Sequence, residues 1–168
     1  MSKAAVNRTV TPAPVRRSVR VAAPQERAFK VFTAGVGRWW PRSHHIGASD
    51  LDTVVIEPKA GGRWYERGVD GSECEWGKVL ACEPPHRIVV AWQITANGDA
   101  WVYDPDITHA SEFEATFREQ PDGRTLVELE HRNIGRHGAG AAGIYRGVGG
   151  PGGWPGILEN YATVAAAS

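Results

Sequence analysis

The chain has 168 residues and carries 19 lysine and arginine residues against 19 aspartate and glutamate residues. This length suits one hydrophobic core and is short for two ordinary domains. Balanced charge argues against partners that are held by charge alone, such as nucleic acid or an anionic membrane surface. No apolar run approaches the roughly 20 residues of a membrane-spanning helix, and the N-terminus lacks the apolar stretch of a secretory signal. We therefore expect a cytoplasmic protein that does not insert into membranes.

The first part of the chain predicts an arm, a strand and a helix. Residues 1–14 show no hydrophobic period and predict a disordered arm, which leaves 15–168 as a single domain. Alternating valines in 15–21 indicate a strand that ends before Pro24. Residues 24–32 follow as a helix, because Pro24 suits a first turn and Phe29 and Phe32 share one face. The aromatic stretch Trp39-Trp40-Pro41 then predicts a short turn or helix.

The middle of the chain predicts an antiparallel meander. Asp-Gly and Pro-Asp-Gly signals separate its apolar runs, and connections this short force neighbouring strands to pair antiparallel. The expected strands are 53–57, 63–67, 73–82, 86–94, 109–119 and 124–133. Residues 95–108, which include Trp101, form the one long connection, and we leave a binding lid and plain surface decoration open for it.

The C-terminal part predicts an irregular segment and a helix. Residues 135–153 are dense in glycine, and we expect a flexible or irregular segment at 138–143. From Trp154 to the end, Ile157, Leu158, Tyr161 and Val164 recur at helical spacing and give the last helix an apolar face. The sheet is the one large surface that this face can cover.

Strand alternation predicts which side chains point into the fold. It places Trp92, Phe113, Phe117 and His131 inside. On the fourth strand it favours Trp76, Leu80 and Cys82. His131 then either orients a ligand group or is simply a buried group bonded to a neighbour, and the second alternative is the more usual.

Several motifs suggest a disulfide, a metal site or a cofactor site, but their spacing or context does not support one. Cys74 and Cys82 lie in one strand, roughly 26 Å apart at about 3.3 Å per residue, so both are expected to be free thiols. Adjacent His44 and His45 are expected in an exposed loop rather than on a metal. Asp104 and Asp106 fit a solvated turn around Pro105. The glycines of 138–143 match a dinucleotide fingerprint without its βαβ context, so we expect no cofactor, no metal and no assignable catalytic residue.

Seven tryptophans are the compositional oddity. Tryptophan combines a large flat surface with one polar N–H, so the group either lines a cavity or fills a core. Composition leaves these two alternatives open.

The chain resembles the START-like (SRPBCC) superfamily, and within it the homologues of the activator of the heat-shock-protein-90 ATPase. The likeness rests on Trp39-Trp40-Pro41, on Gly61-Gly62-Arg63-Trp64-Tyr65-Glu66, on Trp76-Gly77-Lys78-Val79, on 83–88, and on Trp92, His131 and Gly153-Trp154. It implies an α+β helix-grip fold, in which a curved antiparallel sheet of six to seven strands wraps around a C-terminal helix. It spans roughly residues 15–165.

The resemblance is specific for a fold and weak for one activity. Its leading implication is a domain that binds an apolar or aromatic small molecule, with Glu66 and His131 orienting a polar group of the ligand. The apolar wall is expected from Trp39, Trp40, Trp64, Trp76, Trp92, Phe113, Phe117 and Trp154. Alternatives are a cyclase, aromatase or hydrolase that uses His131 as acid or base, and a protein that stimulates a chaperone ATPase. Self-association as a homodimer also stays open.

Overall fold

The computed structural model describes residues 13–168, so the expected arm at 1–14 lies almost wholly outside the described residues. Within that range, one seven-stranded antiparallel sheet has the strand order β1-β9-β8-β5-β4-β3-β2. Its strands are β1 (Val15–Val21), β2 (Leu51–Ile56), β3 (Arg63–Gly68), β4 (Glu73–Glu83), β5 (Arg87–Trp92), β8 (Ser111–Glu119) and β9 (Thr125–Arg132). All seven strands expected from the sequence are present, and neighbours in the predicted meander pair antiparallel.

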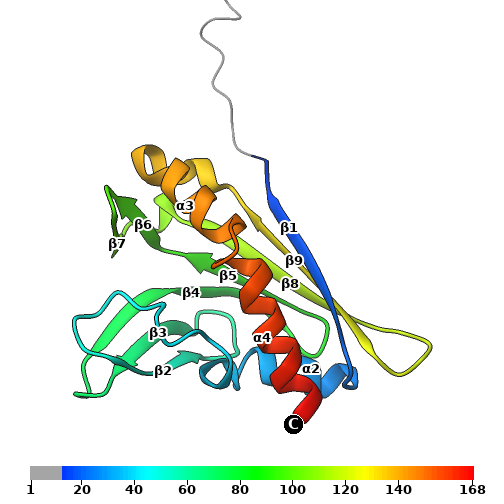
Figure 1. Cartoon of the computed structure of the whole chain (residues 1–168). Helices are drawn as coiled ribbons and strands as arrows, with labels where there is room; N and C mark the ends of the chain where they lie inside the picture. Colours follow the sequence, from blue (N-terminus) through cyan, green and yellow to red (C-terminus); the bar gives the residue numbers. More distant parts are fainter. Residues whose placement is uncertain (1–12) are drawn as a thin grey trace, which may run out of the picture.

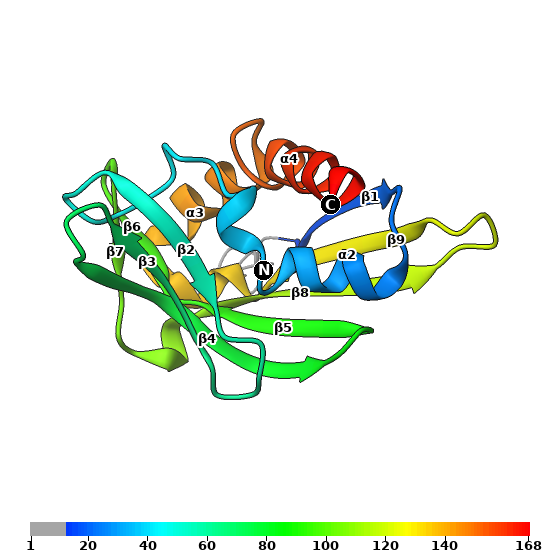
Figure 2. The same ribbon diagram turned by 90° about the horizontal axis from the view of Figure 1, so that it is seen from below.

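The helices lie on the concave side of this sheet. Helix α2 (Gln25–Phe32) leads into the short 3-10 turn η1 (Val36–Arg38), and α4 (Trp154–Ala167) crosses the sheet near the end of the chain. Figure 1 shows α4 running diagonally over the strands, and Figure 2 shows the sheet curving beneath α4 and α2. The hydroxyl of Tyr161 donates a 2.6 Å hydrogen bond to the carbonyl of Ala28, which joins the two helices. The architecture is the expected α+β helix-grip fold.

Three of the four residues expected on the apolar face of α4, Ile157, Leu158 and Tyr161, are buried. The fourth, Val164, is only partly buried against the core, and Ala165 is buried beside it. Pro155 occupies the first turn, where a missing N–H costs nothing. Inward alternation is also confirmed for β8 and β9, where Phe113, Phe117 and His131 are almost inaccessible to solvent. Each of these side chains faces the helices from the concave side.

The long connection after β5 forms a hairpin rather than an irregular loop. Strand β6 (Ile94–Asn97) pairs with β7 (Ala100–Tyr103), and the 3-10 turn η2 (Ile107–His109) follows. Gly98, with a φ of 65°, supplies the left-handed conformation that the two-residue turn requires. The hairpin therefore projects Trp101 from a regular strand.

The expectation of a flexible or irregular segment at 138–143 was wrong. The chain there forms the 3-10 segment η3 (Ile134–Gly140) and helix α3 (Ala141–Gly149), with Ile144 and Val148 buried. Its glycines permit close packing: a Cβ on Gly140 would lie 2.6 Å from the carbonyl oxygen of Ala96. Three of the glycines, Gly140, Gly143 and Gly147, therefore lie in close contact with the β6–β7 hairpin.

The inward placement of Leu80 was also wrong. Its residue is 41% exposed, whereas the neighbouring Val79 is 1% exposed. The β3–β4 register shifts at Trp76, because Trp64 pairs with Gly77 and Tyr65 pairs with Glu75, and such a bulge reverses the alternation on which the prediction depended. Trp76 is buried as expected, and Cys82 packs partly buried against the core.

Candidate functional site

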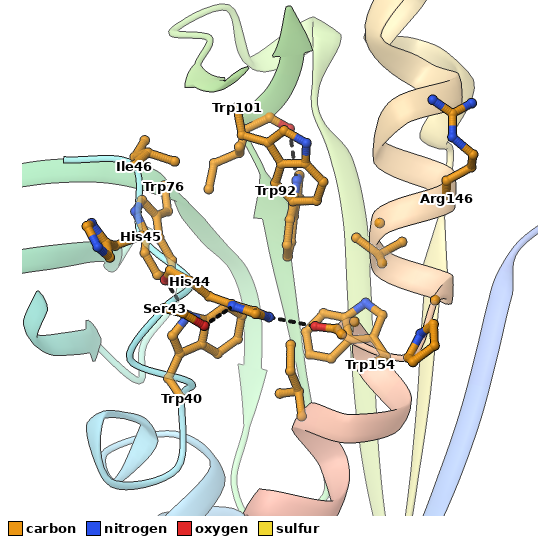
Figure 3. Close-up of a pocket in the computed structure, with 18 of the residues that line it drawn as sticks. Trp40, Ser43, His44, His45, Ile46, Trp76, Trp92, Trp101, Arg146 and Trp154 are labelled. Carbon is orange, nitrogen blue, oxygen red and sulfur yellow. Dashed lines mark hydrogen bonds between the residues drawn. The ribbon is translucent and has the colours of Figure 1, made fainter. Parts of the chain in front are cut away.

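A pocket of about 630 Å³ opens between the sheet, the α3–α4 connection and the loop that precedes β2. This volume lies within the range of small-molecule sites. Figure 3 shows Trp40 and Trp76 on one side of it, Trp154 on the side of the last helix, and Trp92 and Trp101 together between them. Its side-chain lining comprises Trp40, Ser43, His44, His45, Ile46, Trp76, Trp92, Ile94, Asp99, Trp101, Arg146, Val148, Pro151, Trp154 and Ile157.

The wall is built from indole rings in mutual contact. Trp92, on β5, has its ring centroid 6.0 Å from that of Trp154 and 6.2 Å from that of Trp101. Trp40 lies 5.3 Å from Trp76 and 6.2 Å from Trp154. Tilted and edge-to-face pairs at these spacings are favourable. The result is a cluster of contacting indole rings along the pocket, in which Trp76, Trp92 and Trp154 are each at most 3% exposed.

Four of the five pocket indoles donate their N–H to the protein itself. Trp40 donates to the carbonyl of His44, and Trp76 donates to the carboxylate of Glu66. Trp92 donates to the carbonyl of Ile94, and Trp154 donates to a ring nitrogen of His131. These four indoles therefore have no free N–H group to present to the pocket.

Glu66 holds the loop that forms one side of the pocket. Its carboxylate is 2% exposed and accepts hydrogen bonds from the backbone N–H groups of Ile46 (2.7 Å) and Gly47 (3.1 Å). The indole of Trp76 supplies the third donor at 2.8 Å, and Nδ1 of His45 lies 4.0 Å away. A buried carboxylate with several donors fixes its surroundings strongly. Glu66 thus positions the pocket loop and Trp76 from behind the wall.

His44 bridges the two sides of the opening. Its Nε2 lies 2.6 Å from the carbonyl oxygen of Gly152, and its Nδ1 lies 3.1 Å from the hydroxyl of Ser43. A carbonyl only accepts, so Nε2 carries the proton and Nδ1 accepts from Ser43. Figure 3 shows this ring reaching across toward Trp154. The pre-β2 loop is thereby tied to the α3–α4 connection.

His131 belongs to a buried hydrogen-bond chain behind Trp154. Nδ1 of His131 accepts from the indole of Trp154 at 3.0 Å, so the neutral ring carries its proton on Nε2 and donates it to Ser111 Oγ at 2.8 Å. The Ser111 hydroxyl then donates to Nε2 of His137 at 2.7 Å. Burial lowers the pKa of His131 to about 3 and that of His137 to about 4. Both rings are therefore neutral at ordinary pH.

The structure divides the ten ligand-binding residues expected from the sequence into two groups. Trp40, Trp76, Trp92 and Trp154 line the pocket. The other six lie in the core or behind the wall, namely Trp39, Trp64, Glu66, Phe113, Phe117 and His131. A ligand-binding role for the ten remains a prediction.

Sequence reasoning did not assign a site role to Trp101, His44, His45 or Arg146, all of which line the pocket. For Trp101 a signal existed, because the long connection after β5 was a candidate lid. For the others none did: the two histidines were expected in an exposed loop, and they lie half-buried at the opening. Arg146 lies on helix α3, which was not predicted because the segment is rich in glycine.

The two cysteines and the turn that contains Asp104 and Asp106 lie outside the pocket. Cys74 and Cys82 are both free, as expected. Asp104 and Asp106 flank a turn and contact the ring of His109 at 2.9 and 3.4 Å. Residues 13–168 contain no group of three or more His, Cys, Asp or Glu side chains that could hold a metal ion. In the same range, no helix has the length and apolar character needed to cross a membrane.

Solved structures share this architecture over nearly the whole chain. An anthrahydroquino-γ-pyrone synthase, Txn09, is 40% identical with a TM-score of 0.64, over 92% of this chain and 97% of its own. CalC from Micromonospora echinospora, a self-sacrificing resistance protein, is 31% identical with a TM-score of 0.65, over 92% and 94% of the two chains. Protein MLL2253 from Mesorhizobium loti shares the fold at 19% identity and a TM-score of 0.63, over 93% and 98%.

No curated protein sequence matches the chain. The profile of the family described as "Activator of Hsp90 ATPase homolog 1-like protein" matches residues 22–163. That match runs from the end of β1 through most of α4 and so includes every strand that contributes to the pocket. The chain therefore belongs to the activator of Hsp90 ATPase homolog 1-like family.

Proposed function

We propose that residues 15–168 act as one domain that binds a flat aromatic or apolar small molecule in the tryptophan pocket. The observation that carries this proposal is the pocket of about 630 Å³ with indole rings of five tryptophans on its wall. Concave sites with mostly apolar walls and few polar groups are the usual form of small-molecule sites. The 40% identity to a synthase named for an anthrahydroquinone-pyrone product supports a polycyclic aromatic ligand.

Native mass spectrometry of the purified protein is the first test, because a retained molecule would appear as added mass. The second is a titration with 2-(hydroxymethyl)anthracene, in which energy transfer from tryptophan to the anthracene reports binding. Saturable transfer at a stoichiometry of one supports the proposal. Absence of both a retained molecule and saturable transfer would contradict it.

Replacing Trp101 by alanine is expected to weaken binding of this probe about two- to ten-fold. The expectation follows because an aromatic contact contributes about 0.5–1.5 kcal/mol beyond area burial. Trp101 is only half-buried and sits on the hairpin, so the substitution leaves the sheet intact. Tyr103→Ala is the matched control, because Tyr103 lies on the same strand without lining the pocket. Equal dissociation constants for the two variants would exclude Trp101 from the site.

A ring-closing synthase is a second candidate, and the identity to Txn09 favours it. Such an enzyme needs a group that moves a proton within hydrogen-bond reach of the bound molecule. His131 is poorly suited, since both of its ring nitrogens are engaged and it lies behind Trp154. His44 lines the pocket and could exchange its bond to Gly152 for one to a substrate.

The synthase candidate predicts that wild type and His44→Gln carry different compounds after expression in the same host. A cyclisation without loss of atoms leaves mass unchanged, so the extracted compounds are compared by absorption spectrum and chromatographic retention. An altered spectrum in the variant supports ring closure. The same compound in both proteins would favour binding without chemistry. Stimulation of a chaperone ATPase remains a prediction from the family resemblance.

A further inference from the structure

The pocket distributes its polarity unevenly, and this asymmetry constrains the ligand. Four indole N–H groups of the pocket donate hydrogen bonds within the protein, namely those of Trp40, Trp76, Trp92 and Trp154. The inner wall therefore presents hydrocarbon and ring faces. An unpaired ligand oxygen placed against that wall would lose its hydration without a donor in return. The interior therefore disfavours a ligand with polar substituents all around its edge.

Ionised side chains occur only at the opening of the pocket. Arg146 comes from the last turn of α3 and Asp99 from the turn of the β6–β7 hairpin, and both are exposed. No salt bridge joins either of them to another side chain within residues 13–168. Figure 3 shows Arg146 on the α3 side of the pocket, beyond Trp101 and Trp92. Its five N–H donors are thus available to an oxygen-bearing group at the rim.

The other polar side chains at the rim are bonded within the protein. Ser43 donates to His44, His44 donates to the carbonyl of Gly152, and Nδ1 of His45 lies 3.0 Å from the carbonyl oxygen of Gly47. Arg146 therefore supplies the free donors, and Asp99 is the one carboxylate among the residues that line the pocket. A guanidinium binds a carboxylate or an ionised phenol more strongly than a neutral group, so Arg146 would hold an acidic oxygen on the part of the ligand that faces solvent.

We infer that the pocket takes a polycyclic aromatic acid in one orientation, with its unsubstituted rings between the tryptophans and its single acidic oxygen group at Arg146. The inference rests on the proposed small-molecule function and deepens it by naming the ligand class. It assigns Arg146 as a specificity-determining residue.

The test compares three probes that share one ring system: anthracene-2-carboxylate, 2-(hydroxymethyl)anthracene and anthracene-2,6-dicarboxylate. The monoacid is expected to bind about two- to five-fold more tightly than the neutral alcohol, as for an ion pair at an exposed rim. The diacid is expected to bind at least about ten-fold more weakly than the monoacid, because one carboxylate would have to enter the apolar interior. Dissociation constants come from energy transfer at fixed ionic strength.

Arg146→Met retains most of the aliphatic stem and removes the charge. It is expected to abolish the preference for the monoacid over the alcohol, which is measured as the ratio of the two dissociation constants in the same variant. Arg136→Met is the matched control, because Arg136 is exposed on the neighbouring η3 and pairs with Glu112 at 3.5 Å rather than lining the pocket. Its binding constants should equal those of wild type.

The outcomes separate this inference from the proposed function. If the alcohol binds but the monoacid gains nothing, or if Arg146→Met keeps the preference, the assignment of an acidic ligand is overturned and small-molecule binding stands. If the diacid binds as well as the monoacid, the single orientation is overturned. If none of the three anthracenes binds, the proposed function and the inference both fail.

Discussion

Replacing Trp64 by alanine is expected to lower the free energy of unfolding by about 3–5 kcal/mol, the usual cost of emptying a large aromatic site in a core. Trp64 has no exposed surface and its ring centroid lies 5.2 Å from that of Trp76, 5.4 Å from that of Trp92 and 5.3 Å from that of Phe113. Its removal would leave a cavity bounded by rings that the pocket also uses. Urea denaturation followed by circular dichroism measures the change.

Trp64→Phe distinguishes a packing role from a binding role. The indole N–H of Trp64 has no hydrogen-bond partner among residues 13–168, so phenylalanine removes a buried orphan donor together with part of the ring. We expect this variant to retain most of the stability and to bind the anthracene alcohol as wild type does. A large loss of affinity without a loss of stability would place Trp64 in the binding site after all.

Acidification from pH 6.5 to 5 is expected to lower the free energy of unfolding by about 3 kcal/mol through His131 and His137 together. In the unfolded chain each histidine binds a proton below about pH 6.5. In the folded protein, burial holds the pKa of His131 at about 3 and that of His137 at about 4, so neither ring is protonated in this window. Protons therefore bind preferentially to the unfolded state, and stability falls as the pH falls.

Urea denaturation at pH 6.5, 5.8 and 5.0 measures this slope for wild type, His131→Gln and His137→Gln. Each variant removes one titrating ring and should lose about half of the slope, whatever its stability at pH 6.5. The exposed His109, whose pKa Asp104 raises through a hydrogen bond, acts in the opposite direction and is retained in all three proteins. A slope in His131→Gln equal to that of wild type would contradict the buried neutral state assigned to this ring.

The strand pattern was readable from the sequence because alternation and turn chemistry are local. Phe113, Phe117 and His131 were expected inside and are inside, since β8 and β9 pair without a register shift. Leu80 was misplaced because the bulge at Trp76 depends on the pairing of β4 with β3, which a single strand does not reveal. Likewise, the glycines near the start of α3 predicted an irregular segment. Their close contact with the hairpin, which permits a helix there, exists only in the folded chain.

By itself the sequence determined the succession of strands along the chain and most of the apolar face of the last helix, because each depends on periods of two or 3.6 residues along a short segment. The α+β helix-grip class followed from the family resemblance. Only the tertiary structure decided which tryptophans form the wall of a pocket. Trp64 and Trp92 are both buried and both aromatic, but they differ in whether a cavity adjoins them. That difference arises because segments distant in sequence meet in space. The positions of His44 and Arg146 at the opening have the same origin.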